Sequence, residues 1–193
     1  SARWSYGQCW SDAGIKCGSP FQINTYTSGQ QSTPVAAPLS DGGFILTWGS
    51  YDQDGSGWGI YAQQFNASCS KIGAEFRVNN HTAGDQASPA IATLVSGNMV
   101  ITWSSYDQDG SGGGIYGQYY TSNGLKVGDE FQVSTYTYED QSSVKIAGLQ
   151  DGGFLVVWAS YGQDGSGYGI FGQRFDINAN KIAVLVTFQP TYA

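Results

Sequence analysis

The chain has 193 residues, a formal net charge of −7, and an abundance of glycine (28), tyrosine (13) and tryptophan (6). The acidic balance argues against nucleic-acid binding, which requires a basic face, and the longest apolar run, Ile182 to Val186, is far too short to span a membrane. Low charge and many Ser, Thr and Asn residues favour an extracellular protein, and the chain is interpreted as a mature product whose secretion signal has been removed.

The chain begins with half of a unit that recurs later. Residues 5–27, SYGQCWSDAGIKCGSPFQINTYT, align without a gap with residues 60–82, IYAQQFNASCSKIGAEFRVNNHT. Trp48, Trp103 and Trp158 lie 55 residues apart, and a fixed period of this size indicates stacked supersecondary units. We therefore predict one repeat body over 1–193, with the second half of a unit at 6–27 and successive units at 28–82, 83–137 and 138–193, the last incomplete or altered.

Each unit is predicted to hold four antiparallel strands joined by short connections. Apolar residues alternate along Phe44–Trp48 with the period of two that a strand requires. Glycine-rich turns precede and follow this segment and accept positive φ at low cost. The fold class expected is all-β: three tandem 55-residue, four-stranded, blade-like meanders with overlapping half-repeats at the termini. Within a unit the first strand is expected at Phe76–Asn79, the second at Pro89–Leu94 and the third at Met99–Trp103, and the fourth is expected at Gly59–Phe65 in the preceding copy. The tryptophans are expected in the core.

The motif runs GGFILTW, SYDQDGSGxGIYxQxF and KIGxEFxVNxxT extend over the chain from Tyr6 to Lys181. They resemble a tandem repeat of roughly fifty residues in large bacterial secreted and surface proteins, which often carry adhesin-like or calcium-binding modules elsewhere. The resemblance implies a non-enzymatic repeat on the cell surface. The chain differs from that pattern in its three cysteines and in its last strand, KIAVLVTFQP.

The loops between the third and fourth strands are candidate calcium sites. Asp52, Asp54 and Ser56 place oxygen atoms at alternate positions, and Asp107, Asp109 and Ser111 repeat the pattern, as at the start of a calcium loop. The third copy has Gly162 in place of the first Asp. The alternative is a glycine-rich hairpin loop whose aspartates bind their own backbone. No other cofactor is predicted.

Cys9 and Cys17 lie symmetrically about the turn at residues 12–14, so a hairpin would bring them within the Cβ distance that a disulfide needs. This bond would stabilise the hairpin by roughly 2–3 kcal/mol and would indicate an oxidising compartment. Cys69 is expected to stay outside this bond.

The triplets beginning at Asn66 and Asn80 fit the glycosylation sequon. No His, Ser and carboxylate arrangement predicts catalysis, so the chain is expected not to be an enzyme.

The last strand predicts self-assembly. Leu185 replaces the glutamates of the internal copies, Glu75 and Glu130, so that this segment is apolar on both faces. Such a strand favours insertion into an incomplete sheet. The function predicted is an extracellular structural subunit that assembles head to tail into a filament or surface array by terminal strand complementation. Its partners would be copies of itself, and glycans are a further candidate. Closure within one chain and a monomeric carbohydrate- or calcium-binding adhesin module are the alternatives. The predicted assembly residues are Val184, Leu185, Val186 and Phe188.

Overall fold

The computed structural model describes residues 5–11 and 13–188, without the side chains of 184–188. These residues form three four-stranded sheets and one two-stranded sheet, and every pair of neighbouring strands is antiparallel. The all-β prediction is confirmed: fourteen strands are present and the described residues contain no helix. It follows that no described segment is a helix long and apolar enough to cross a membrane.

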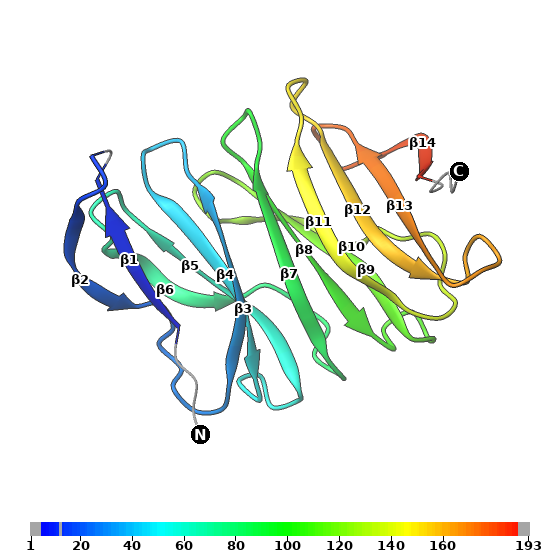
Figure 1. Ribbon diagram of the computed structural model, residues 1–193, viewed down its shortest axis with the longest axis horizontal. Coiled ribbons are helices and arrows are strands. Elements are labelled where there is room, and N and C mark those ends of the chain that lie inside the picture. Colours follow the sequence, from blue (N-terminus) through cyan, green and yellow to red (C-terminus); the bar gives the residue numbers. More distant parts are fainter. Residues whose placement is uncertain (1–4, 12, 189–193) are drawn as a thin grey trace.

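The sheets follow one another along the chain, and we name them the half-blade and blades 1 to 3 (Figure 1). The half-blade contains β1 (Tyr6–Trp10) and β2 (Lys16–Gln22). Blade 1 contains β3 (Gln31–Pro38), β4 (Phe44–Tyr51), β5 (Trp58–Phe65) and β6 (Lys71–Arg77). Blade 2 contains β7 (Gln86–Thr93), β8 (Met99–Tyr106), β9 (Gly113–Tyr120) and β10 (Lys126–Gln132). Blade 3 contains β11 (Gln141–Gly148), β12 (Phe154–Tyr161), β13 (Tyr168–Phe175) and β14 (Lys181–Phe188).

The order of strands within a unit differs from the prediction in one respect. The strand that contains Phe76 is predicted to be the first of its four, but Phe76 lies on β6, where it pairs with Ala62 as part of the last strand of blade 1. The chain then crosses to β7, the first strand of blade 2. The reason is local: the turn Asn66–Ser70, closed by the Asn66 amide donating to the Ser70 carbonyl at 2.9 Å, makes a hairpin of β5 and β6.

The fourth strand of each blade (β6, β10 or β14), which we call the outermost strand, is irregularly paired with the third strand at one point. A buried glutamine on the third strand replaces the missing backbone hydrogen bond. The pairing of β5 with β6 shifts after Ala62, and the Gln63 side chain donates to the Ile72 carbonyl at 2.8 Å. Gln118 and Gln173 do the same in blades 2 and 3, at 3.2 and 2.7 Å. The amide therefore satisfies a carbonyl that the bulge removes from the ladder.

The hydrophobic core is divided into three clusters, one at each junction between successive sheets. The cluster between blades 1 and 2 joins Ile45 and Ile60 to Trp103. The junction before it holds Trp48, and the junction after it holds Trp158. These tryptophans have exposed fractions of 0, 0 and 2%, so the prediction that they occupy equivalent core positions is confirmed. Each blade is thus stabilised by contact with its neighbours, as expected of stacked repeats.

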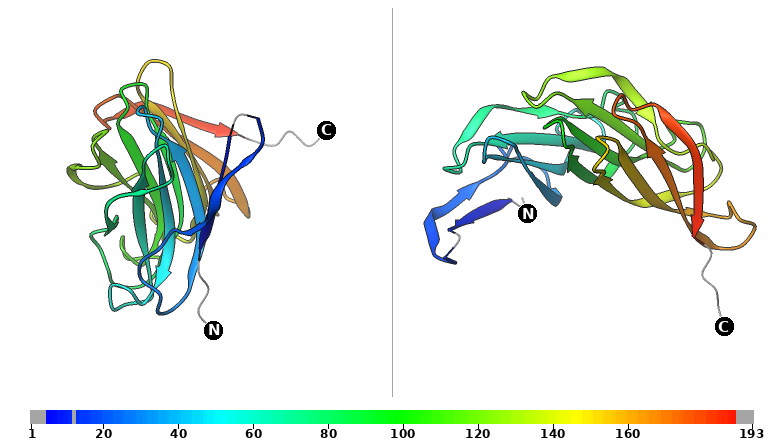
Figure 2. Two further views of the ribbon diagram at one scale, coloured as in Figure 1. Left: turned by 90° about the vertical axis from the view of Figure 1, so that its left-hand side faces the viewer. Right: turned by 90° about the horizontal axis from the view of Figure 1, so that it is seen from above.

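The blades form a curved array, as the view from above shows (Figure 2). The innermost strands β3, β7 and β11 lie next to one another, and the outermost strands lie on the convex side. The half-blade is at one end of the array and β13 and β14 are at the other (Figure 1). The array therefore has two terminal faces, and the candidate site is located there.

Candidate functional site: the open ends of the blade array

The predicted calcium loops are hairpin loops whose aspartates bind their own backbone. The Ser56 amide donates to Asp54 Oδ1 at 3.3 Å, and the Asp52 amide donates to the Gly57 carbonyl at 2.6 Å. In blade 2 the Asp107 amide donates to the Gly112 carbonyl at 2.7 Å, and the Ser111 amide donates to Asp109 Oδ1 at 3.5 Å. Nowhere in residues 5–11 and 13–188 do three or more His, Cys, Asp or Glu gather as a metal-binding group. These contacts match the hairpin alternative.

The disulfide joins Cys9 to Cys69, with the two Cα atoms 6.8 Å apart. The predicted bond between Cys9 and Cys17 is therefore wrong, and so is the expectation that Cys69 stays outside the bond. Cys9 and Cys17 do lie opposite each other on β1 and β2, but Cys17 is a free, exposed thiol. The bond crosses from the half-blade to the turn after β5. A disulfide of this kind is typical of proteins from oxidising compartments.

The sequence alone did not suggest this pairing because Cys69 belongs to the next unit. The repeat nevertheless contains the signal: the equivalents of Cys9 are Gln64 and Tyr119, and these side chains also approach the turn of the following blade. A Cβ added to Gly124 would lie 2.9 Å from Gln64 Nε2, and the Tyr119 hydroxyl donates to the Ile177 carbonyl at 3.1 Å. The disulfide thus occupies the position at which, at each junction, a side chain of one sheet contacts the turn of the following blade.

Both sequon asparagines are exposed, on opposite ends of the strands. Asn66 lies in the turn between β5 and β6, where its Oδ1 accepts hydrogen bonds from the Ser68 and Ser70 amides at 3.0 and 2.9 Å. Asn80 lies between β6 and β7, and its Oδ1 accepts a bond from Lys126 Nζ at 2.7 Å. Both positions are therefore accessible to a modifying enzyme, and their use stays a prediction.

A repeated glutamate ties the outermost strand to the connection that leads into the same blade. Glu75 on β6 accepts the Thr25 amide at 2.6 Å and Gln53 Nε2 at 2.6 Å. Glu130 on β10 accepts the equivalent Asn80 amide at 2.7 Å and Gln108 Nε2 at 2.5 Å. Charge-assisted bonds of this length are the stronger kind. In blade 3 the equivalent residue is Leu185, which has no acceptor side chain, so β14 lacks this attachment.

The terminal face of blade 3 is apolar and open. In blades 1 and 2 the equivalents of Ile170 are Ile60 and Ile115, which contact the following blade and are 0% exposed. Ile170 itself is 49% exposed, and Tyr168 beside it is 62% exposed. The difference arises because no described strand covers this face. Blade 3 therefore presents the surface that blades 1 and 2 use to bind their successors.

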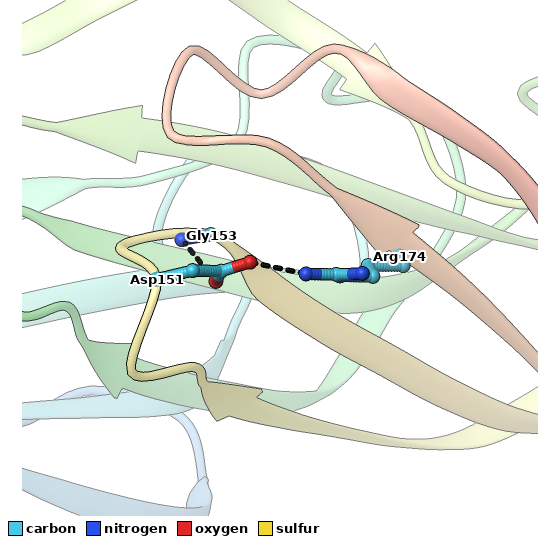
Figure 3. A network of polar contacts seen from close by, with 3 residues as sticks. All are labelled: Asp151, Gly153 and Arg174. Atoms are coloured by element: carbon cyan, nitrogen blue, oxygen red, sulfur yellow. Dashed lines mark hydrogen bonds and ion pairs between the residues drawn. The ribbon is translucent and has the colours of Figure 1, made fainter.

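An ion pair lies beside this face (Figure 3). Arg174 on β13 contacts Asp151, which is in the turn before β12. The Asp151 carboxylate also accepts the Gly153 amide at 3.1 Å, and this bond, followed by the guanidinium, holds the pKa of Asp151 below its ordinary value. Arg174 lies at the position equivalent to Cys9 and Tyr119, the one that faces the next junction in the other sheets.

The half-blade has the complementary open face. Tyr6 is 56% exposed, whereas its equivalent Tyr61 is 6% exposed, and Trp10 is 58% exposed, whereas its equivalent Phe65 is fully buried. Tyr61 and Phe65 contact the preceding sheet. The half-blade therefore presents the surface with which blades 1 to 3 contact their predecessors.

The predicted assembly strand lies at the edge of its own sheet. Val186 and Leu185 pair with Gly172 and Gln173 on β13, in the register of the other blades. The half-blade makes no pair with β14 in the described structure. Closure within one chain by this strand is therefore absent from this arrangement, and donation to a second copy requires β14 to leave β13.

A shallow hollow of about 340 Å³ lies where the three innermost strands converge, lined in part by Thr33, Ser88, Ser143 and Lys145. The first three residues have φ between 50 and 58° and mark a bulge in each strand. Their hydroxyl groups offer hydrogen bonds to a polar ligand. Glycoside hydrolysis requires a pair of carboxyl groups, and β3, β7 and β11 contain no Asp or Glu.

No family model and no curated protein matches this sequence. Solved structures show the same fold. A protein of unknown function from Dyadobacter fermentans DSM 18053 matches with a TM-score of 0.57 and 10% identity over 81% of this chain and 53% of that chain. The chain thus spans about half the length of that relative.

Two further structures are glycoside hydrolases. The endo-arabinase from Bacteroides thetaiotaomicron VPI-5482 matches with a TM-score of 0.58 and 14% identity, over 87% of this chain and 67% of that chain. A thermostable family-43 glycoside hydrolase matches with a TM-score of 0.52 and 11% identity, over 98% of this chain and 72% of that chain. At such identities the likeness establishes the arrangement of blades alone, and this chain shares its fold with enzymes that act on glycosides.

Proposed function

We propose that this chain is an extracellular structural subunit that associates head to tail, blade 3 of one copy docking on the half-blade of the next. The observation that supports it is the complementarity of the two ends. Ile170 and Tyr168 lie on the face that binds a following blade, and Tyr6 and Trp10 lie on the face that binds a preceding one. A joint between copies would repeat a contact that already occurs three times in the chain.

The apolar surface at the two ends is sufficient to matter. Covering a half-exposed Ile, Tyr or Trp contributes on the order of 1 kcal/mol each at about 25 cal/mol per Å². Such a contact joins two different surfaces, so repetition gives a ring if the rotation closes and a filament if it does not. The exposed sequons at Asn66 and Asn80 and the disulfide agree with a secreted product.

The test is the state of association of the purified chain across a concentration series, by light scattering and negative-stain imaging. We expect ordered multimers, and we expect Ile170→Ser or Tyr6→Ser to weaken them at least tenfold. Val95→Ser and Leu125→Ser are matched controls, because these residues are 67 and 66% exposed but lie in turns away from the two faces. A wild-type chain that stays monomeric at millimolar concentration would refute the proposal.

A second candidate is glycan binding at the hollow between β3, β7 and β11. Three exposed hydroxyl side chains and Lys145 converge there, on a fold that this chain shares with an endo-arabinase. We expect any binding to occur without hydrolysis, since these strands have no carboxylate. Calorimetry with arabino-oligosaccharides and an assay for released reducing ends test the two points separately.

A further inference from the structure

The strand β1 has an unpaired edge. In every blade the equivalent strand lies between two partners: β5, for instance, pairs with β4 on one side and β6 on the other. Within the described residues β1 pairs with β2 alone. Its other edge therefore presents backbone N–H and C=O groups that an additional strand would satisfy.

We propose that residues 183–188 of the next copy occupy this edge, in the position that β4 holds in blade 1. This inference rests on the head-to-tail association proposed above and identifies the segment and register that join two copies. It requires β14 to exchange its place on β13 for a place on the half-blade of a neighbour, as in other cases of strand donation and domain swapping.

The sequence of the segment fits the new place. Val184 to Phe188 reads VLVTF, and the core of β4, Phe44 to Trp48, reads FILTW. Thr187 then corresponds to Thr47 and Phe188 to Trp48. The equivalent outermost segments instead read AEFRV and DEFQV at residues 74–78 and 129–133. The last segment is therefore more similar to a second strand than to the fourth strand whose place it occupies.

Burial in the repeat gives the physical reason. The outermost strands β6 and β10 are mostly exposed, which suits their charged residues. The second strands β4 and β8 are buried on both faces over almost their whole length. A segment that is apolar on both faces is therefore removed from water on both sides only in the position of a second strand such as β4 or β8. Because Leu185 replaces the glutamate that holds β6 and β10, the segment is also held less firmly in blade 3.

The direction and length of the chain permit the exchange. The strand β14 runs antiparallel to β13, and β1 is the equivalent of β13 in the next half-blade, so the segment would run antiparallel to β1, as β4 does to β5. Packed sheets lie about 10 Å apart. Residues 176–182 span up to ~23 Å when extended, which is enough to move from the edge of one blade to the interior of the next.

The register follows from blade 1, where Trp48 pairs with Tyr61 and Phe44 pairs with Phe65. Tyr6 and Trp10 lie 55 residues before Tyr61 and Phe65 and are their equivalents in the half-blade. The same register would therefore pair Phe188 with Tyr6 and Val184 with Trp10. A cross-link tests this directly. Trp10→Cys and Val184→Cys are prepared as separate chains in a Cys17→Ser background, mixed, and oxidised. We expect a disulfide-linked dimer in the mixture only. Ala183→Cys is the control, because a shift of one residue points the side chain to the other face of the sheet.

A second variant keeps the test independent of the cross-link. Leu185→Glu restores the acceptor for Gln163 in blade 3, and at the proposed site it would bury a carboxylate where Ile45 is 0% exposed in blade 1. We expect this variant to remain monomeric and to unfold at a higher temperature than the wild-type monomer. Leu185→Ile is expected to assemble at wild-type concentration, within about twofold.

The outcomes separate the two proposals. If the wild type assembles but Leu185→Glu assembles equally well and the Trp10→Cys and Val184→Cys chains form no link, the strand exchange is refuted and docking of the blade faces stands. If the wild type itself stays monomeric, the head-to-tail association is refuted. A link from the Trp10→Cys chain to Ala183→Cys in place of Val184→Cys would overturn the register.

Discussion

The disulfide between Cys9 and Cys69 should make a large and separable contribution to stability. It closes a loop with a sequence separation of 60, for which the chain-entropy relation gives about 4 kcal/mol at 25 °C. The rejected bond between Cys9 and Cys17 would close only a short loop, for which the same relation gives about 2.5 kcal/mol. The two pairings therefore predict different losses of stability on removal of the bond, and they predict that a different cysteine, Cys69 or Cys17, is the one whose substitution destabilises the fold.

Cys69→Ser is expected to lower the free energy of unfolding by about 4 kcal/mol, which at about 2 to 4 °C per kcal/mol corresponds to a fall in Tm of about 8 to 16 °C. Cys17→Ser should change Tm by less than about 2 °C, since the thiol is exposed and outside the bond. Calorimetry on the oxidised monomeric proteins measures both. The reasoning is refuted if Cys17→Ser is the destabilising change, or if peptide mapping recovers Cys69 as a thiol.

Three further predictions concern the blades. Glu130→Leu should cost about 1 to 3 kcal/mol in urea unfolding, because it removes the acceptor for Asn80 and Gln108, whereas the adjacent Asp129→Leu should be nearly neutral; equal effects would contradict the role of the glutamate. Burial, followed by a neighbouring aspartate, raises the pKa of Tyr61 to about 12. The folded state keeps the proton when the unfolded state has lost it, so stability should fall as pH rises from about 10 to 12, and Tyr61→Phe should show a weaker fall when Tm is followed against pH. Millimolar calcium should leave Tm unchanged, since the loop aspartates bind their own backbone; a rise of several degrees would support a calcium site after all.

The repeat was visible in the sequence because stacked units reuse the same residues in the same contacts. A period of 55 residues and an alternation of two were enough to predict an all-β array with equivalent, buried tryptophans. The half-unit at residues 6–27 was predicted from alignment alone, and the structure shows it as the hairpin β1–β2. For the loops between the third and fourth strands, local turn chemistry offered a self-bonded hairpin loop as the alternative to a calcium site, and the Asp54 and Ser56 contact matches that alternative.

Contacts between units were decided only by the tertiary structure, because the sequence pattern within one unit does not specify what a side chain meets in the next. Cys9 faces both Cys17 across its hairpin and Cys69 across the junction, and the packing of the half-blade on blade 1 selects Cys69. The hydrogen bond from the Thr25 amide to Glu75, which lies 50 residues later in the chain, is of the same kind. Ile60 and Ile170 are equivalent in sequence, yet one is buried and the other half exposed, since burial depends on whether another blade follows.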